Sequence, residues 1–269
     1  MRDRVLSASW ALLLLLLPIT SMPLVQKMVR SSTVASPSLL LLAVMLGLWL
    51  LPYLLRSGRL PGAFAPLSAF VLAALFSWGA AFFLGAPTFK DNSVLREGVQ
   101  AFITLLLGLG YYLVTSTWVN SSTRLRASLR WINLAGLLII VWSAAQAAAW
   151  FSANRYPGWM RDIQDLLSLG PLYRQRVTGF ALEPSWLAHQ LNMLYLPLWL
   201  AASVHRTSAH SWRVLRLSAE NLLLAAGVVT LGLTLSRVGF LALLAAGSYL
   251  VLRFNIWLVR RIFDWLSTR

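Results

Sequence analysis

The sequence contains no cysteine and few charged residues, and each shortage argues against a class of protein. Without cysteine, the chain has no disulfide, no cysteine-ligated zinc or iron–sulfur site and no thiol nucleophile. Only 12% of its 269 residues are Asp, Glu, Lys or Arg, against about 25% in soluble domains. A soluble protein of this size needs more polar surface than that. We therefore do not expect a soluble enzyme, a disordered tail or a secreted module.

Acidic residues are the scarcest charged class. Eight Asp and Glu stand against 23 Lys and Arg, which gives a net charge of +15. A basic balance can indicate nucleic-acid binding, but here the arginines lie between long apolar runs and form no single basic face. The chain is 58% hydrophobic. We therefore predict a polytopic helical membrane protein and no nucleic-acid partner.

Long apolar runs dominate what is present. A run of about 20 apolar residues crosses a bilayer as a helix. We predict an all-α fold with about eight transmembrane helices in a single transmembrane domain over residues 1–269. The N-terminal run resembles a signal peptide but lacks a small-residue cleavage site, so it is interpreted as a retained span. The predicted spans are 9–26, 37–55, 64–84, 98–119, 131–151, 186–204, 221–235 and 238–252.

The distribution of Lys and Arg gives an orientation. With the N-terminus inside, 14 basic residues fall in inner segments and nine in outer segments. This bias predicts that both termini are cytoplasmic. The longest connection, 152–184, contains four of the nine outer residues, namely Arg155, Arg161, Arg174 and Arg176. Such a local exception to the charge rule is often functional.

The first motif is residues 174–189, at the predicted outer end of the sixth span. Arg174 and Arg176, a close-approaching Gly179 and a helix N-terminus together favour a bound anion, particularly a phosphate. Glu183 would act as a base or hold an arginine in place. A simpler interpretation is a loop and a helix cap, with Glu183 complementing the positive helix end.

Polar side chains continue from this motif into the sixth span. Ser185, His189 and Asn192 share one helix face by their spacing. They line a cavity, or they form hydrogen bonds between helices. The same two interpretations apply to three other intramembrane residues: Gln100, Asn133 and Gln146.

The second motif, residues 234–239, interrupts an apolar run of more than 30 residues. Its Ser236-Arg237 step is either a polar hairpin turn or places Arg237 in an outward-facing cavity, because an arginine near hydrocarbon usually faces protein or water. Both motifs fall on the predicted outer face. Arg176 and Arg237 are therefore candidates to bind the same phosphate.

Together the two motifs resemble those of a known family. Arg176-Val-Thr-Gly179-Phe180-Ala-Leu-Glu183-Pro184-Ser185, followed by an apolar span, is similar to the signature of bacterial O-antigen ligases and polysaccharide polymerases. The later Leu233-Thr-Leu-Ser236-Arg237-Val-Gly239 resembles the Ser-Arg-Gly-like step of that family. The resemblance covers mainly residues 174–244, and the first five spans agree only in topology.

The resemblance implies a membrane glycosyltransferase (GT-C-like) fold and a reaction at the periplasmic face of the bacterial plasma membrane. The donor would be a glycan linked to undecaprenyl diphosphate, and the acceptor a second glycan or a lipid. Arg176 and Arg237 would bind the diphosphate, assisted by Arg174 and supported by Gly179 and Ser236. Such a transfer uses no nucleotide, and no metal or other cofactor is expected because arginine supplies the positive charge.

One departure from the family pattern concerns length. Family members usually continue with a large outer loop and further spans, whereas this sequence ends at Arg269. That loop often carries the proposed base, for which Glu183 or His189 would substitute here. Three interpretations stay open: a truncated member, one part of a fold completed by a second polypeptide, or a degenerate member. The alternative functions are a non-catalytic transporter of a lipid-linked saccharide and a structural membrane subunit.

Overall fold

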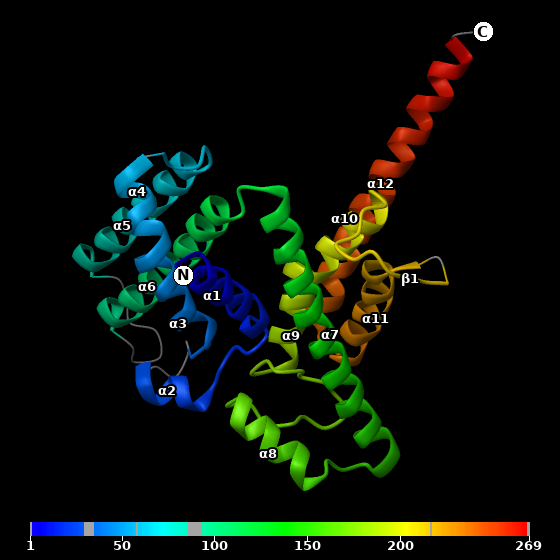
Figure 1. Ribbon diagram of the computed structural model, residues 1–269, viewed down its shortest axis with the longest axis horizontal. Coiled ribbons are helices and arrows are strands. Elements are labelled where there is room, and N and C mark those ends of the chain that lie inside the picture. The colour runs from blue at the N-terminus through cyan, green and yellow to red at the C-terminus, as the bar shows by residue number, and fades with distance from the viewer. Residues whose placement is uncertain (1, 30–34, 58, 86–92, 216, 268–269) are drawn as a thin grey trace. The chain divides into compact units, whose positions relative to one another are not determined.

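The computed structural model describes residues 2–29, 35–57, 59–85, 93–215 and 217–267 (Figure 1). The chain divides into two compact units. Unit 1 comprises Met1–Leu14 and Ser38–Ser128, and unit 2 comprises Leu15–Pro37 and Leu129–Arg269. Two helices, α1 (Arg2–Leu16) and α7 (Ser122–Ala153), contribute residues to both units. The expectation of one transmembrane domain stays a prediction.

Unit 1 is built from helices that pack through aromatic side chains. Its further elements are α3 (Ser38–Met45), the π-helical turn η1 (Leu46–Leu50), α4 (Leu51–Ser57), α5 (Phe64–Phe83) and α6 (Val94–Trp118). Trp49 meets Trp118 edge-on at 4.9 Å, and the Arg124 guanidinium lies 4.0 Å from the Trp118 ring. These contacts tie the end of α6 to η1 and to the start of α7.

Unit 2 contains both sequence motifs. Its elements, besides parts of α1 and α7, are α2 (Pro23–Val29), α8 (Gly158–Leu167), α9 (Pro184–Gln190), η2 (Leu191–Tyr195), α10 (Leu196–Val204), β1 (Arg213–Val214), β2 (Leu217–Ser218), α11 (Ala219–Leu233) and α12 (Arg237–Ser267). The two short strands pair antiparallel, and in Figure 1 α12 runs out past the other helices of the unit.

The two π-helical turns have a common cause. Each lies directly before a proline near the start of the next helix: η1 precedes Pro52, and η2 precedes Pro197. Proline has no N–H and its ring crowds the preceding turn, so the hydrogen-bond ladder widens there. The segment Pro184–Val204 is nevertheless continuously helical and contains the predicted sixth span.

Trp199 is the centre of the unit 2 core. Its side chain is fully buried, and its indole N–H donates to Asn133 Oδ1 of α7 at 2.9 Å. Two glycines give the ring its space, Gly136 on α7 and Gly227 on α11, because a Cβ at either position would contact the indole. Three helices therefore pack around one tryptophan.

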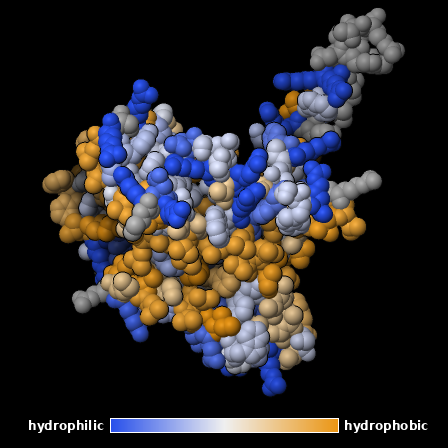
Figure 2. Space-filling view, in the orientation of Figure 1, coloured by the Kyte–Doolittle hydropathy of each residue, from blue (hydrophilic) through white to orange (hydrophobic). Residues whose placement is uncertain are grey.

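The apolar helices agree with an all-α, multi-pass membrane protein. Five described helical segments are long and apolar enough to cross a membrane: Ser38–Arg56, Phe64–Phe83, Val94–Trp118, Ser122–Ala153 and Arg237–Arg261. They contain or closely match the predicted second, third, fourth, fifth and eighth spans. The predicted seventh span coincides with the shorter α11. Figure 2 shows hydrophobic residues over the middle of the unit 2 helices and hydrophilic residues toward their ends. The total of eight spans stays a prediction.

The predicted first span, 9–26, is not one helix. Helix α1 ends at Leu16 and α2 begins at Pro23, with a turn and extended residues between them. Pro18 explains the break, because proline cannot donate to the helical ladder and disfavours helix at the residue before it. Among the basic residues used for the orientation, Arg30, Lys90, Arg216 and Arg269 lie outside the described residues. The orientation itself stays a prediction.

The packing at Trp199 predicts opposite effects of one substitution at two glycines of α11. In Gly227→Ala the new Cβ would lie 2.7 Å from Trp199 Cζ3, so we expect a loss of about 1–3 kcal/mol from overpacking. Gly232→Ala meets no atom within 4 Å and should be neutral or mildly stabilising through helix propensity. Thermal unfolding in detergent measures both. Equal melting temperatures for the two variants would contradict the assigned core.

Candidate functional site

The loop that carries the first motif, residues 168–183, is held by a buried amide of α7. Gln146 is 1% exposed, and its Oε1 accepts hydrogen bonds from the backbone N–H groups of Thr178 (3.0 Å) and Gly179 (3.1 Å). Its Nε2 donates to the Gly179 carbonyl at 3.2 Å. Gly179 has φ +57°, a conformation that glycine adopts without steric cost. The Gln146 side chain therefore supplies hydrogen-bond partners for the irregular backbone at Thr178 and Gly179 and fixes its position.

Other contacts hold the same loop from both sides. The Trp142 and Phe180 rings stack with centroids 5.9 Å apart and planes inclined by 7°. The Leu182 N–H donates to Thr20 Oγ1 at 2.8 Å. Ser168 Oγ donates to the Ala181 carbonyl at 3.2 Å. The loop is thus a fixed part of unit 2.

The two sequence motifs meet in unit 2. The Arg176 Nε–H donates to the Thr234 carbonyl at 2.9 Å, and the next residue, Val177, donates its N–H to the Leu233 carbonyl at 3.1 Å. Segments 58 residues apart in the sequence therefore lie side by side. The carbonyls are at the end of α11, where helical acceptors lack partners in their own helix. Arg176 and Val177 supply those partners.

The second motif forms a tight turn that begins α12. Leu235 has φ +47°, and Thr234 Oγ1 donates to the Leu231 carbonyl at 2.7 Å. Ser236 is the N-cap residue, because its Oγ accepts the Gly239 N–H at 3.3 Å. Arg237 is then the first residue of α12, and its side chain is exposed. An arginine here adds positive charge to a helix end that is already positive.

Gly239 brings the start of α12 close to α9. A Cβ at this position would lie 2.7 Å from the Ala188 Cβ. Asn192 Nδ2 donates to the Gly239 carbonyl at 3.0 Å. For Asn192, the structure therefore has the interhelical hydrogen bond that was one of the two interpretations of the polar stripe.

The two candidate bases lie apart from these contacts. Glu183 is exposed at the N-cap position of α9, and its Oε2 accepts a hydrogen bond from Ser185 Oγ at 3.1 Å. It forms no salt bridge with an arginine among the described residues. His189 is exposed, and its imidazole has no hydrogen-bond partner in the same ranges. Their proposed roles in proton transfer stay predictions.

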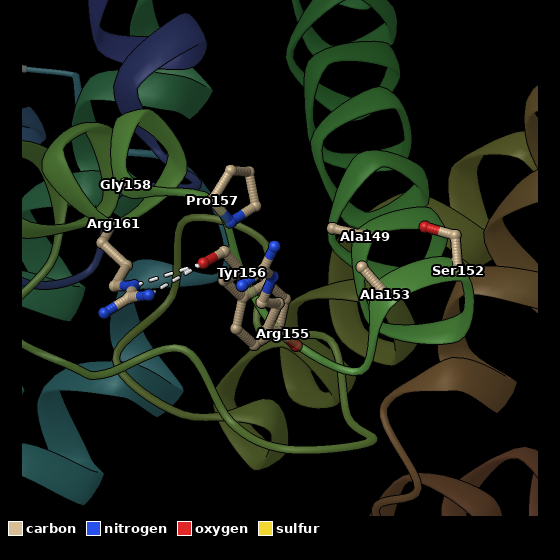
Figure 3. Close-up of a pocket in the computed structure, with 8 residues that line it drawn as sticks. All are labelled: Ala149, Ser152, Ala153, Arg155, Tyr156, Pro157, Gly158 and Arg161. Atoms are coloured by element: carbon tan, nitrogen blue, oxygen red, sulfur yellow. Dashed lines mark hydrogen bonds between the residues drawn. The ribbon is translucent and has the colours of Figure 1, made fainter.

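Arg174 lines a cavity of its own rather than the contact of the two motifs. This cavity, of about 370 Å³, lies between the end of α7, α8 and the loop that follows α8. Arg155, Arg161 and Asp165 also line it. A neighbouring cavity of about 490 Å³ shares Arg155 and Arg161 (Figure 3). The sequence indicated an excess of arginine in this segment but not that three of the side chains share one cavity.

Tyr156 fixes the wall between these two cavities. Its hydroxyl donates to the Tyr173 carbonyl at 2.7 Å. Its backbone carbonyl accepts hydrogen bonds from Arg161 Nε (3.3 Å) and Nη2 (3.0 Å), which Figure 3 shows as dashed lines. Burial raises the pKa of the Tyr156 hydroxyl above its ordinary value of 10.0, so it stays protonated at neutral pH. The hydroxyl holds Tyr156 to the loop at Tyr173, and the Tyr156 backbone carbonyl holds Arg161.

The arginines of the two motifs, Arg174, Arg176 and Arg237, form no salt bridges within the described ranges, although Asp165 lines the same cavity as Arg174. Within those ranges, the Arg176 side chain forms only its bond to Thr234. Unneutralised guanidinium groups on a fixed backbone favour an anionic ligand. No group of three His, Cys, Asp or Glu side chains among the described residues is arranged to bind a metal ion. No family model, curated protein or solved structure matches the chain.

The hydrogen bonds of Gln146 predict a specific instability. Gln146→Leu leaves the buried N–H groups of Thr178 and Gly179 without acceptors, at about 1–3 kcal/mol each. We expect a lower melting temperature in detergent and faster amide hydrogen exchange at residues 177–180. Gln100→Leu is the matched control, because this exposed glutamine of α6 has no side-chain hydrogen bond within the described residues. Unchanged exchange in Gln146→Leu would show that another contact holds the loop.

Proposed function

We propose that the chain binds a glycan linked to undecaprenyl diphosphate at the outer face of the bacterial plasma membrane and transfers or polymerises it. The reaction class is that of the O-antigen ligase and polysaccharide polymerase family, which the two motifs resemble. The product would belong to a cell-surface polysaccharide such as O-antigen or exopolysaccharide. Both termini would be cytoplasmic.

The observation that carries the proposal is the contact between the two motifs. Each motif alone is a short pattern on an apolar background. The hydrogen bond from Arg176 to the Thr234 carbonyl puts the two motifs side by side. Thr234 lies three residues before Arg237 in the sequence. A shared diphosphate requires this proximity of the two arginines. The contact therefore supports one binding site composed of both motifs.

Charge supports a diphosphate as the group that is bound. The Arg176 Nη1 and Nη2 atoms have no partner among the described residues, and the Arg237 guanidinium is exposed. Arginine binds phosphate through two parallel N–H donors. The first N–H groups of α12 add donors beside Arg237. Arg174, with Arg155 and Arg161, would hold another anionic or hydroxyl-rich part of the donor in the 370 Å³ cavity.

In the proposed reaction an acceptor hydroxyl attacks the anomeric carbon of the donor glycan. A new glycosidic bond forms as the bond to the diphosphate breaks, and the bonding electrons leave with the diphosphate. Arg176 and Arg237 would stabilise the negative charge that develops on this leaving group. The hydroxyl proton would pass to a base, for which Glu183 and His189 are the candidates. The charge for this step would come from arginine, with no metal or nucleotide.

A non-catalytic function is the alternative. A transporter of the lipid-linked saccharide, or a membrane subunit completed by a second polypeptide, would bind the same diphosphate without forming product. Two exposed candidate bases with no fixed orientation toward the arginines are compatible with this alternative. Measuring donor binding and product formation separately distinguishes the two functions.

Arg237 gives the sharper test of the site. Arg237→Ala removes a charge without breaking any hydrogen bond within the described residues, whereas Arg176→Ala also breaks the bond to Thr234. One charge-assisted contact is worth about 1.5–3 kcal/mol, so the affinity for undecaprenyl diphosphate should fall about tenfold to a hundredfold. Arg253→Ala is the control, since this arginine is also exposed on α12 and lies four turns beyond Arg237.

The measurement uses purified protein and labelled undecaprenyl diphosphate, followed by a donor-consumption assay with the glycan attached. The proposal predicts weaker binding and less product for Arg237→Ala and neither for Arg253→Ala. Normal binding by Arg237→Ala would remove the proposed site. Arginine-dependent binding without any product from the wild-type chain would favour the transporter or subunit alternative.

A further inference from the structure

A third cavity in unit 2 lies far along α7 from the two arginine-rich cavities. It has a volume of about 280 Å³ and is bounded by the first half of α7, the segment after α10 and the start of α11. Its wall is almost entirely apolar, and its apolar side chains include Leu134, Leu137, Ile140, Trp212, Leu222 and Ala226. Neither sequence motif contributes to it.

One end of this cavity is cationic. Arg130 and His210 both line it, and Arg130 is exposed. The Arg130 Nε–H donates to the Ala209 carbonyl at 2.8 Å, and its two terminal nitrogens have no partner within the described residues. The His210 imidazole offers one N–H donor in either neutral tautomer. Three donor nitrogens therefore gather at this end, two from the always charged Arg130 guanidinium and one from the His210 imidazole.

The backbone that carries His210 is fixed in place. Ser208 Oγ donates to Glu220 Oε2 at 2.7 Å, and the Ala209 N–H donates to Glu220 Oε1 at 2.9 Å. Glu220 is only 3% exposed and does not line the cavity. With the bond from Arg130 to Ala209, the segment is attached to both α7 and α11. The cationic end is therefore preorganised.

The dimensions of the cavity match one half of a bilayer. From Arg130 to Ile140 the α7 wall spans ten residues, or about 15 Å at the helical rise of about 1.5 Å per residue. Half of a hydrocarbon core of about 30 Å has the same depth. Trp212, beside the His210 ring at 5.8 Å, lies at the charged end, where tryptophan is enriched at membrane interfaces.

We propose that this cavity binds one anionic phospholipid, with its phosphate at Arg130 and His210 and one acyl chain along the groove between α7 and α11. Basic pockets between membrane helices are a known mode of anionic-lipid recognition. A water-soluble phosphate would gain nothing from the apolar wall, and an uncharged lipid would gain nothing from Arg130. An anionic diacyl lipid uses both ends, independently of the proposed glycan transfer.

The test measures lipid binding by delipidated, detergent-purified protein with native mass spectrometry. Phosphatidylglycerol and phosphatidylcholine with identical acyl chains are titrated separately. We expect one phosphatidylglycerol per chain, bound at least tenfold more tightly than phosphatidylcholine. Added inorganic phosphate should not displace it. Equal affinity for the two lipids, or displacement by free phosphate, would overturn the proposal.

Four variants separate the charge from the groove. Arg130→Gln should lower phosphatidylglycerol affinity about tenfold, whereas Arg130→Lys should retain most of it. Arg126→Gln, one turn earlier on α7 and not lining the cavity, should bind normally. Ala226→Phe should fill the groove and reduce binding of both lipids. Equal losses in Arg126→Gln and Arg130→Gln would indicate general surface charge. Full binding by Ala226→Phe would contradict an acyl chain in the groove.

Discussion

The architecture of unit 2 depends on hydrogen bonds from two buried amides of α7. Asn133 accepts the Trp199 indole N–H and donates to Glu220 Oε1 at 2.9 Å, so it joins α7 to α10 and α11. Gln146 holds the backbone of the loop at Thr178 and Gly179. In apolar surroundings, an unpaired polar group costs several kcal/mol, and irregular backbone persists only where protein satisfies it. Asn133 and Gln146 supply these hydrogen bonds at two positions along α7.

The hydrogen-bond partners of these two amides could not be predicted from the sequence. Their residue type and apolar surroundings marked Asn133 and Gln146 as unusual, and left both cavity lining and interhelical hydrogen bonding open. Which one applies depends on what the facing segments present. The structure presents an indole and a carboxylate to Asn133 and two backbone N–H groups to Gln146. Those partners are 32 to 87 residues distant, and no local pattern contains them.

The helical extents and the meeting of the motifs followed more directly from the sequence. Apolar runs fix where a helix can cross a membrane, and five predicted spans have apolar helices of sufficient length. Residues 174–189 and 234–239 each adjoin a span end on the same predicted face, which made their proximity an expectation. Helix α8 was missed, although its apolar residues Trp159, Met160 and Ile163 recur at helical spacing. Its ten residues interrupt the apolar positions with charged and amide side chains, so α8 forms no apolar run of the length that marks a span.

Two of the five non-glycine residues with positive φ in the described part of the chain lie next to the two motif contacts. Gln175 has φ +60° directly before Arg176, and Leu235 has φ +47° directly before Ser236. Left-handed conformations are costly for such residues and persist where surrounding contacts impose them. Here the contacts are the bonds of Arg176 and Val177 to the end of α11. The left-handed residues accompany the contact between the two motifs, and they turn the chain sharply beside the candidate arginines, Arg176 and Arg237.

The proposed lipid cavity and the cavity of Arg174 lie at opposite ends of α7. From Arg130 to Ala153 the helix rises about 35 Å, slightly more than a hydrocarbon core of about 30 Å. One end carries the lipid cavity, and the other reaches Arg155 and the cavity of Arg174. A charge at either end would therefore lie at a different membrane surface, in water rather than hydrocarbon. Salt screens the electrostatic interaction between exposed charges beyond about 10 Å, so the charge at one end would not change ligand affinity at the other. The two sites can consequently be tested by separate substitutions in the same chain.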